Sequence, residues 1–210
     1  MKKFICLVCL LSIASYCSAQ KIPSAYKQYF GNCCNLKKTS IRSFLEIDGY
    51  YVLSFIDTES NTGTVSDTNQ YKIIFYENGL CVSGWAVYVK TIKDVYTEIE
   101  RIINNGSKDW FYKTAAWGKY EIRNDTIVTR NIIYGTLIRP VNVWEVRYKI
   151  VNRTTIVQID EKKLVRTGKH GVQQTEKNDA VYFQANFVPL QTIPVSDYSW
   201  LRRQKCDASD

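Results

Sequence analysis

Two stretches of the chain repeat one hairpin pattern, which constrains the fold more than any other feature of the sequence. WGKYEIRNDTIVTRNII covers 117–133, and WEVRYKIVNRTTIVQI covers 144–159. Tyr120-x-Ile122-x-Asn124 in the first stretch matches Tyr148-x-Ile150-x-Asn152 in the second. In both, apolar residues alternate with charged ones before an Asn, which accepts the left-handed conformation of a turn at little cost. Each stretch is therefore predicted to form an antiparallel hairpin with one buried face.

Further strand signals lie on both sides of this repeat. Asn78-Gly79 stands between two runs of β-branched and aromatic residues, which is the strongest short signal for a hairpin. Polar segments rich in turn residues, at 58–70 and 166–178, are predicted to be loops. The strands predicted outside the repeat are 44–57, 71–76, 81–89 and 180–188.

One helix is predicted among the strands, at 91–105. Its apolar residues recur at helical spacing; they are Ile92, Val95, Tyr96, Ile99, Ile102 and Ile103. Thr91 can cap its beginning, and Asn105-Gly106 ends it. Because one face is apolar, the helix is expected to pack against the sheet or over its mouth.

These elements predict a mainly β fold, an up-and-down antiparallel β-barrel of about eight strands. Hairpins between sequence neighbours suit this topology, and closure removes the exposed edges that favour aggregation. The barrel domain is placed at 44–190, after an N-terminal extension at 20–43 and before a C-terminal tail at 191–210. A β-sandwich is the alternative.

The N-terminus predicts export. Lys2 and Lys3 precede an apolar run at 4–14, and Cys17-Ser18-Ala19 supplies small residues before a cleavage site. The signal peptide is therefore placed at 1–19, with Gln20 as the first mature residue. The run is shorter than the roughly 20 residues that span a bilayer, and no later segment is predicted to be transmembrane. The expected location is the periplasm, the cell surface or the extracellular space. An outer-membrane lipoprotein acylated at Cys17 is the alternative.

The charge pattern gives no reason to expect nucleic acid as a partner. Losing Lys2 and Lys3 lowers the 28 Lys and Arg residues to 26, against 20 Asp and Glu. The basic residues are scattered as short pairs and form no continuous stripe of the kind that binds a phosphate backbone.

Four cysteines remain after the predicted cleavage: Cys33, Cys34, Cys81 and Cys206. An even number in an oxidising compartment predicts disulfide bonds. A bond between the neighbours Cys33 and Cys34 is strained, so we expect Cys206 to pair with one of them and Cys81 with the other. Alternatively, some of these thiols are small buried side chains.

No pattern of catalytic or metal-binding residues is evident. The single histidine, His170, lies in a polar stretch without a neighbouring nucleophile or orienting acid. Adjacent cysteines do not have the spacing of a zinc site. We therefore expect a protein that is not an enzyme, with no catalytic residue, metal site or cofactor.

Aromatic residues are the candidates for a binding site. A barrel of about eight strands either fills its interior with side chains or holds one small apolar ligand. The candidates for lining such a pocket are Trp85, Trp117, Tyr120, Trp144 and Tyr148. The alternating pattern is clearest around Tyr120, Trp144 and Tyr148, which are expected to point inward. Ordinary core packing is the alternative for each of them.

Three motifs carry a resemblance to a known family. They are Gly49-Tyr50-Tyr51, Asn78-Gly79 and the hairpin beginning WGKYEIRNDTI at 117–127. Over 46–160 the chain resembles lipocalin-like (calycin-type) proteins exported by Gram-negative bacteria. The resemblance implies a non-catalytic barrel that binds a small hydrophobic molecule. The alternative is a structural or interaction module with a filled barrel, whose partner is another envelope protein.

Overall fold

The computed structural model describes residues 22, 24–30, 39–54, 70–84, 92–133, 141–167, 171–177 and 183–201. The predicted signal peptide, Trp85, His170 and three of the four mature cysteines lie outside these residues. The strands are β1 Gly49–Ser54, β2 Gln70–Phe75, β3 Leu80–Ser83, β4 Ala116–Arg123, β5 Thr126–Ile133, β6 Asn142–Asn152, β7 Thr155–Thr167, β8 Gly171–Lys177 and β9 Phe183–Pro189. The α-helices are α2 Ser24–Phe30, α3 Ile92–Asn105 and α4 Phe111–Thr114, and three short 3-10 segments are η1 Ile41–Ser43, η2 Gly106–Lys108 and η3 Ser196–Tyr198.

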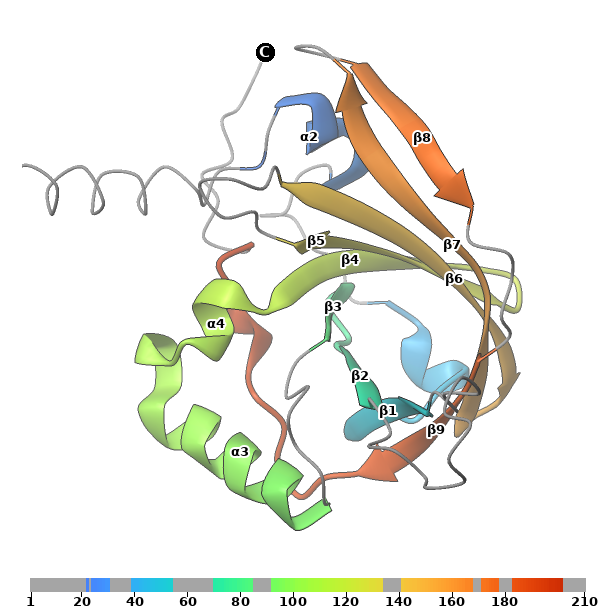
Figure 1. Cartoon of the computed structure of the whole chain (residues 1–210). Coiled ribbons are helices and arrows are strands. Elements are labelled where there is room, and N and C mark those ends of the chain that lie inside the picture. The colour runs from blue at the N-terminus through green and yellow to red at the C-terminus, as the bar shows by residue number, and fades with distance from the viewer. Residues whose placement is uncertain are drawn as a thin grey trace, which may run out of the picture.

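Eight of the nine strands in the described residues close into an up-and-down antiparallel barrel, as the sequence predicts. From β1 to β7 each strand pairs with the next one along the chain, and β9 pairs with both β7 and β1. Figure 1 looks into the resulting ring of strands. Since the ring is continuous, the β-sandwich alternative is wrong.

The remaining strand, β8, was not expected. The sequence predicts a loop at 166–178, whereas β7 extends to Thr167 and β8 pairs with its second half, from Thr167↔Gly171 to Lys162↔Lys177. Among the described residues β8 pairs with no other strand. Its sequence, GVQQTEK, has almost no apolar alternation, because a strand outside the ring does not have to bury one of its faces.

The two repeated hairpins form β4–β5 and β6–β7, and they lie in one continuous sheet. Tyr120 is paired with Thr129, and Tyr148 is paired with Ile127 of the neighbouring strand β5. Asn124 has a φ of 57° in the first turn, the left-handed conformation that the sequence predicts for it.

Two apolar cores lie on opposite faces of the barrel wall. The inner core fills much of the ring and takes side chains from all eight barrel strands, including Leu53, Ile73, Tyr120, Val146 and Tyr148. The outer core joins the wall to the helices and the C-terminal segment; it includes Ile74, Val82, Ile99, Tyr112 and Trp200.

Helix α3 packs in the outer core, so it covers the outside of the barrel. Val95, Ile99 and Ile102 are buried, while Tyr96 and Ile103 on the flank of that face are exposed. Figure 1 shows α3 and α4 beside the ring, with the C-terminal segment between them and the strands. Within the described part of the chain, none of the helices has the length and apolar content that crossing a membrane requires.

Candidate functional site

At one end of the barrel, the chain that enters it packs into the interior. The segment through η1 places Ile41, Leu45 and Ile47 in the inner core, each at most 3% exposed. The backbone N–H of Glu46 donates to the carbonyl of Arg153 in the β6–β7 turn. The Tyr51 hydroxyl bonds the carbonyls of Glu46 and Arg153 at 3.1 and 2.9 Å. This region is called the packed end below.

The inner side chains at the packed end form a continuous aromatic cluster. The Phe75 ring meets the rings of Tyr51 and Tyr120 edge-on, with centroids 5.8 and 5.3 Å apart. Tyr51 also contacts Phe187 at 5.4 Å. The Tyr120 hydroxyl donates to the carbonyl of Tyr76 at 2.7 Å and lies 2.7 Å from Thr39 Oγ1. With its polar atoms bonded within the protein, this end is built as a core.

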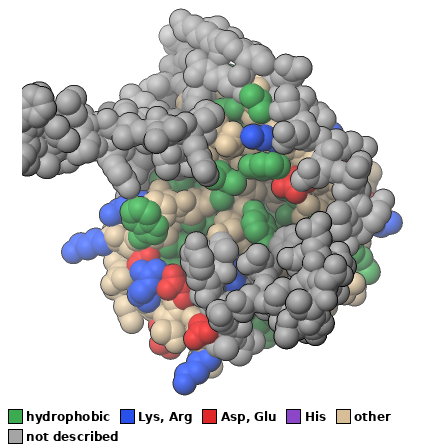
Figure 2. Space-filling model, in the orientation of Figure 1, with side chains coloured by type: hydrophobic (Ala, Val, Ile, Leu, Met, Phe, Trp, Pro, Cys, Tyr) green, Lys and Arg blue, Asp and Glu red, His purple; other side chains and the backbone are tan. Residues whose placement is uncertain are grey.

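The opposite end of the ring is lined differently. The inward-facing side chains there are polar or only half-buried. We call this region the polar end and define it by five residues: Tyr71, Ser83, Trp144, Glu161 and Lys163. Ser83 is buried, whereas the other four are half-buried even though they face the interior. Figure 2, in the orientation of Figure 1, shows hydrophobic side chains together with acidic and basic ones near the centre of the view. The inward surface is therefore accessible at the polar end.

A β-bulge brings the two charged residues of the polar end inward. Tyr148 pairs with Gln158 and Arg147 with Asp160, so Ile159 is the extra residue in β7. After the bulge, Glu161 is opposite Val146 and Lys163 is opposite Trp144, and opposite residues share a face of the sheet. Without the extra residue, both charges would face outward.

The polar groups of this end form three separate pair contacts. The Tyr71 hydroxyl donates to Ser83 Oγ at 3.0 Å, and Gln158 Nε2 donates to Glu161 Oε2 at 3.1 Å. Lys163 Nζ lies 5.9 Å from the centre of the Trp144 ring, a cation–π distance. Hydroxyl, amide, carboxyl and ammonium groups are thus gathered beside aromatic rings.

Burial shifts the pKa values of the Glu161 carboxyl and of two inward-facing tyrosines, Tyr71 and Tyr148. Burial raises the pKa of the Glu161 carboxyl, and the hydrogen bond from Gln158 opposes this rise. Burial also raises the pKa of Tyr71 to about 12, and the nearby Glu161 charge adds to the effect. The pKa of Tyr148 is well above its usual value because of burial, with smaller contributions from Tyr71 and Glu161.

The structure places three of the five predicted aromatic residues on the inner face. Tyr120 and Tyr148 are buried in the inner core, and Trp144 is half-buried at the polar end. Trp85 lies outside the described residues. Tyr120 belongs to the packed end, and Tyr148 is buried in the inner core four residues along β6 from Trp144, so of the predicted set only Trp144 belongs to the polar end.

Trp117 is a correction, because it faces away from the barrel interior. It is fully buried in the outer core, where its ring stacks on Tyr76 at 5.6 Å and on Tyr112 at 6.3 Å. Its indole N–H donates to the carbonyl of Phe111. Trp117 therefore anchors α4 to the wall. The sequence could have predicted this orientation, because residues three apart in a strand, such as Trp117 and Tyr120, face opposite sides of the sheet.

Cys81 is a second correction. Its thiol is free and fully buried on the inner face, where the Asn131 side-chain amide contacts the sulfur at 3.7 Å. Burial raises the pKa of this thiol to about 12. The disulfide bond expected at Cys81 is therefore absent, and this cysteine packs as a small apolar side chain. Cys33, Cys34 and Cys206 lie outside the described residues, and their pairing stays a prediction.

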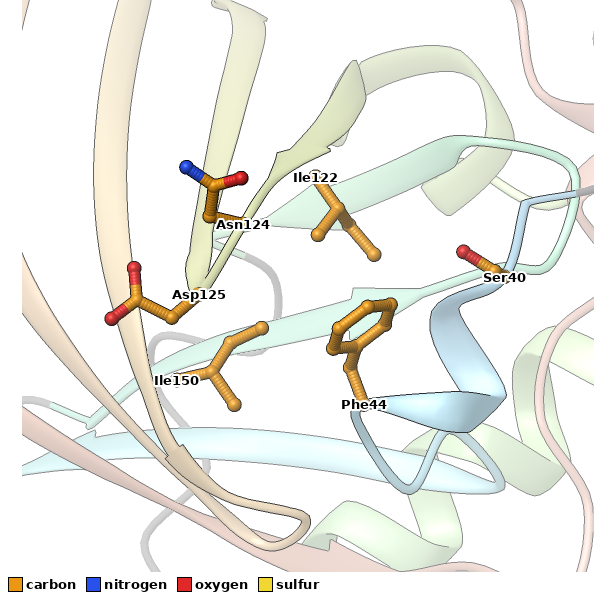
Figure 3. Close-up of a pocket in the computed structure, with 6 residues that line it drawn as sticks. All are labelled: Ser40, Phe44, Ile122, Asn124, Asp125 and Ile150. Atoms are coloured by element: carbon orange, nitrogen blue, oxygen red, sulfur yellow. The ribbon is translucent and has the colours of Figure 1, made fainter.

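A hollow of about 560 Å³ lies at the packed end, where two of its lining residues, Ile122 and Ile150, face inward and pack against the inner core (Figure 3). Phe44, Ile122 and Ile150 converge on it, and Ser40, Asn124 and Asp125 complete its lining. The backbone N–H of Ile150 donates to the carbonyl of Asp125, which fixes the adjoining turn. The hollow has an apolar floor but no buried polar group to orient a ligand, which distinguishes it from the polar end.

Within the described residues, no group of three or more His, Cys, Asp or Glu side chains is arranged to hold a metal ion. Comparisons of the chain with family models, with curated proteins and with solved structures gave no significant match. The class of protein is therefore defined by its architecture, an eight-stranded up-and-down β-barrel with outer helices.

Proposed function

We propose that this protein is an exported, lipocalin-like binding protein without catalytic activity, which holds one small, mostly apolar molecule at the polar end of its barrel. Lipocalins are up-and-down barrels of eight strands, and a barrel of this size has room for one small ligand. The motifs at Gly49-Tyr50-Tyr51 and Asn78-Gly79 support the same family.

The observation that carries the proposal is the accessibility of inward-facing side chains at the polar end. Tyr71 and Trp144 face the interior and are half-buried, whereas Tyr51 and Phe75 at the packed end are each 1% exposed. Apolar surface with a few placed polar groups is typical of small-molecule sites. A ligand in contact with Tyr71 and Trp144 would bury aromatic surface that the fold itself leaves exposed.

Native mass spectrometry of the mature protein, followed by extraction into organic solvent, tests for a retained ligand. Titration with a neutral phenylnaphthylamine dye then measures binding to the emptied protein. We expect one dye molecule per chain and about tenfold weaker binding in Trp144→Ala, equivalent to about 1.4 kcal/mol.

Trp110→Ala is the matched control, because Trp110 is 60% exposed and does not belong to the inner core. It should bind the dye as the wild type does. No retained molecule and no dye uptake would reject the binding function and favour the alternative, an envelope interaction module with a filled barrel.

A further inference from the structure

We propose that the polar end selects organic amines, with the Glu161 carboxylate as the counter-ion of the ligand's ammonium group. This inference rests on the proposed binding function and adds the chemical class of the ligand. The apolar body of the amine would lie between Trp144, Tyr71 and Phe183, which all face inward and are half-buried.

The first argument is that Glu161 has no cationic partner in the described residues. Its carboxylate accepts one hydrogen bond, from the neutral amide of Gln158. No Lys or Arg nitrogen of the described residues forms an ion pair with it, although ion pairs are frequent on the outer face of the same strands. A partly desolvated carboxylate gains most from a cation that contacts it directly.

The second argument is the aromatic surroundings of the carboxylate. Glu161 is opposite Val146, which is two residues from Tyr148 on the same inner face, and the Glu161 charge raises the pKa of Tyr71 and Tyr148. Their hydroxyl groups and ring faces are suitable neighbours for an ammonium group. The ring of Trp144 already has one primary ammonium group at a cation–π distance, the Nζ of Lys163. The chain therefore shows that this wall of the barrel accepts an alkylammonium group.

The third argument concerns depth within the barrel. Lys163 is opposite Trp144, near the start of β6. Glu161 is opposite Val146, which is two residues further along the strand. The acidic group is therefore deeper than the basic one. A ligand head group that reaches the inner core meets Glu161. At that depth the head group is farther from the charge of Lys163. Because attraction falls with distance, direct contact with the carboxylate outweighs the more distant repulsion.

Three probes with the same hydrocarbon chain isolate the head group: octylamine, octanol and octanoate. We expect calorimetric titration at neutral pH to give at least tenfold tighter binding of octylamine than of octanoate, with octanol between them. Glu161→Gln should weaken octylamine binding at least tenfold and leave octanol binding unchanged. Lys163→Met should tighten octylamine binding, because it removes a competing cation.

Glu121→Gln is the matched control, since Glu121 lies on the outer face of β4 and pairs with Arg123 and Arg130. It should bind all three probes as the wild type does. Thermal unfolding of each variant checks that it is folded.

The outcomes separate this inference from the proposed function. Binding of octanol and octanoate without a preference for octylamine, or an octylamine affinity unchanged in Glu161→Gln, overturns the amine specificity alone. Absence of binding for all three probes overturns the proposed function as well.

Discussion

The two ends of the barrel interior are built from the same strands but differ in what their inward residues do. At the packed end, Tyr51, Phe75 and Tyr120 form a sealed aromatic cluster beneath η1. At the polar end, the inward positions hold Glu161 and Lys163 instead. Fully buried aromatic packing is therefore concentrated at one end, and the proposed binding function places the ligand at the other.

The sharpest test of this difference compares one aromatic residue from each end. Phe75→Ala should lower the free energy of unfolding by about 3–5 kcal/mol, because it opens a cavity in a fully packed cluster. Trp144→Ala should cost only about 1 kcal/mol, because Trp144 is only half-buried. Urea unfolding measures both. Equal losses would show that the polar end is as much a part of the core as the packed end.

Closure of the packed end by η1 is tested at Ile41, which is fully buried. Ile41→Ala should destabilise the protein by about 2–4 kcal/mol, since it removes apolar contacts beneath the barrel strands. The exposed Val195→Ala is a control and should change stability by less than about 0.5 kcal/mol. A loss at Ile41 no larger than at Val195 would mean that η1 does not seal the barrel.

Removal of one hydroxyl group tests how firmly the packed end is fastened to the β6–β7 turn. Tyr51→Phe loses the hydrogen bonds to the carbonyls of Glu46 and Arg153 and should cost about 1–2 kcal/mol. Chemical unfolding measures the change. No change would show that solvent replaces these bonds and that the contact is exposed in solution.

The smallest expected effect is a pH dependence from the polar end. Burial raises the pKa of Glu161 above its unfolded value, so the folded state holds this proton more tightly than the unfolded chain does. Its contribution to stability is therefore complete below the unfolded pKa and is lost as the pH rises through the folded pKa. Glu161→Gln should slightly raise the unfolding temperature at neutral pH, and the gain should vanish near pH 4.

A gain that persists at low pH would contradict this account of Glu161. Glu121→Gln, on the outer face, should show no such gain at neutral pH, because Glu121 is paired with Arg123 and Arg130.

The sequence predicted the barrel well because alternation and turn residues are local properties. The hairpin repeat, Asn78-Gly79 and the helix at 91–105 each correspond to an observed element, and Tyr120 and Tyr148 share the inner core. The strand β8 was missed because its residues alternate little in polarity.

The polar end was harder to predict, for a different physical reason. The bulge at Ile159 reverses the alternation of β7, so Glu161 and Lys163 point inward although a regular strand would turn them outward. One extra residue leaves little trace in composition or periodicity. Cys81 was misassigned because an even number of cysteines says nothing about which of them are buried.

Amide chemical-shift mapping by NMR, with octanol added to the mature protein, tests the central claim most directly. The account predicts shifts at Tyr71, Ser83, Trp144, Glu161 and Lys163. Phe44, Ile122 and Ile150, around the hollow at the other end, should not shift. Shifts confined to those three residues, or spread evenly over both ends, would contradict the claim that the polar end holds the ligand.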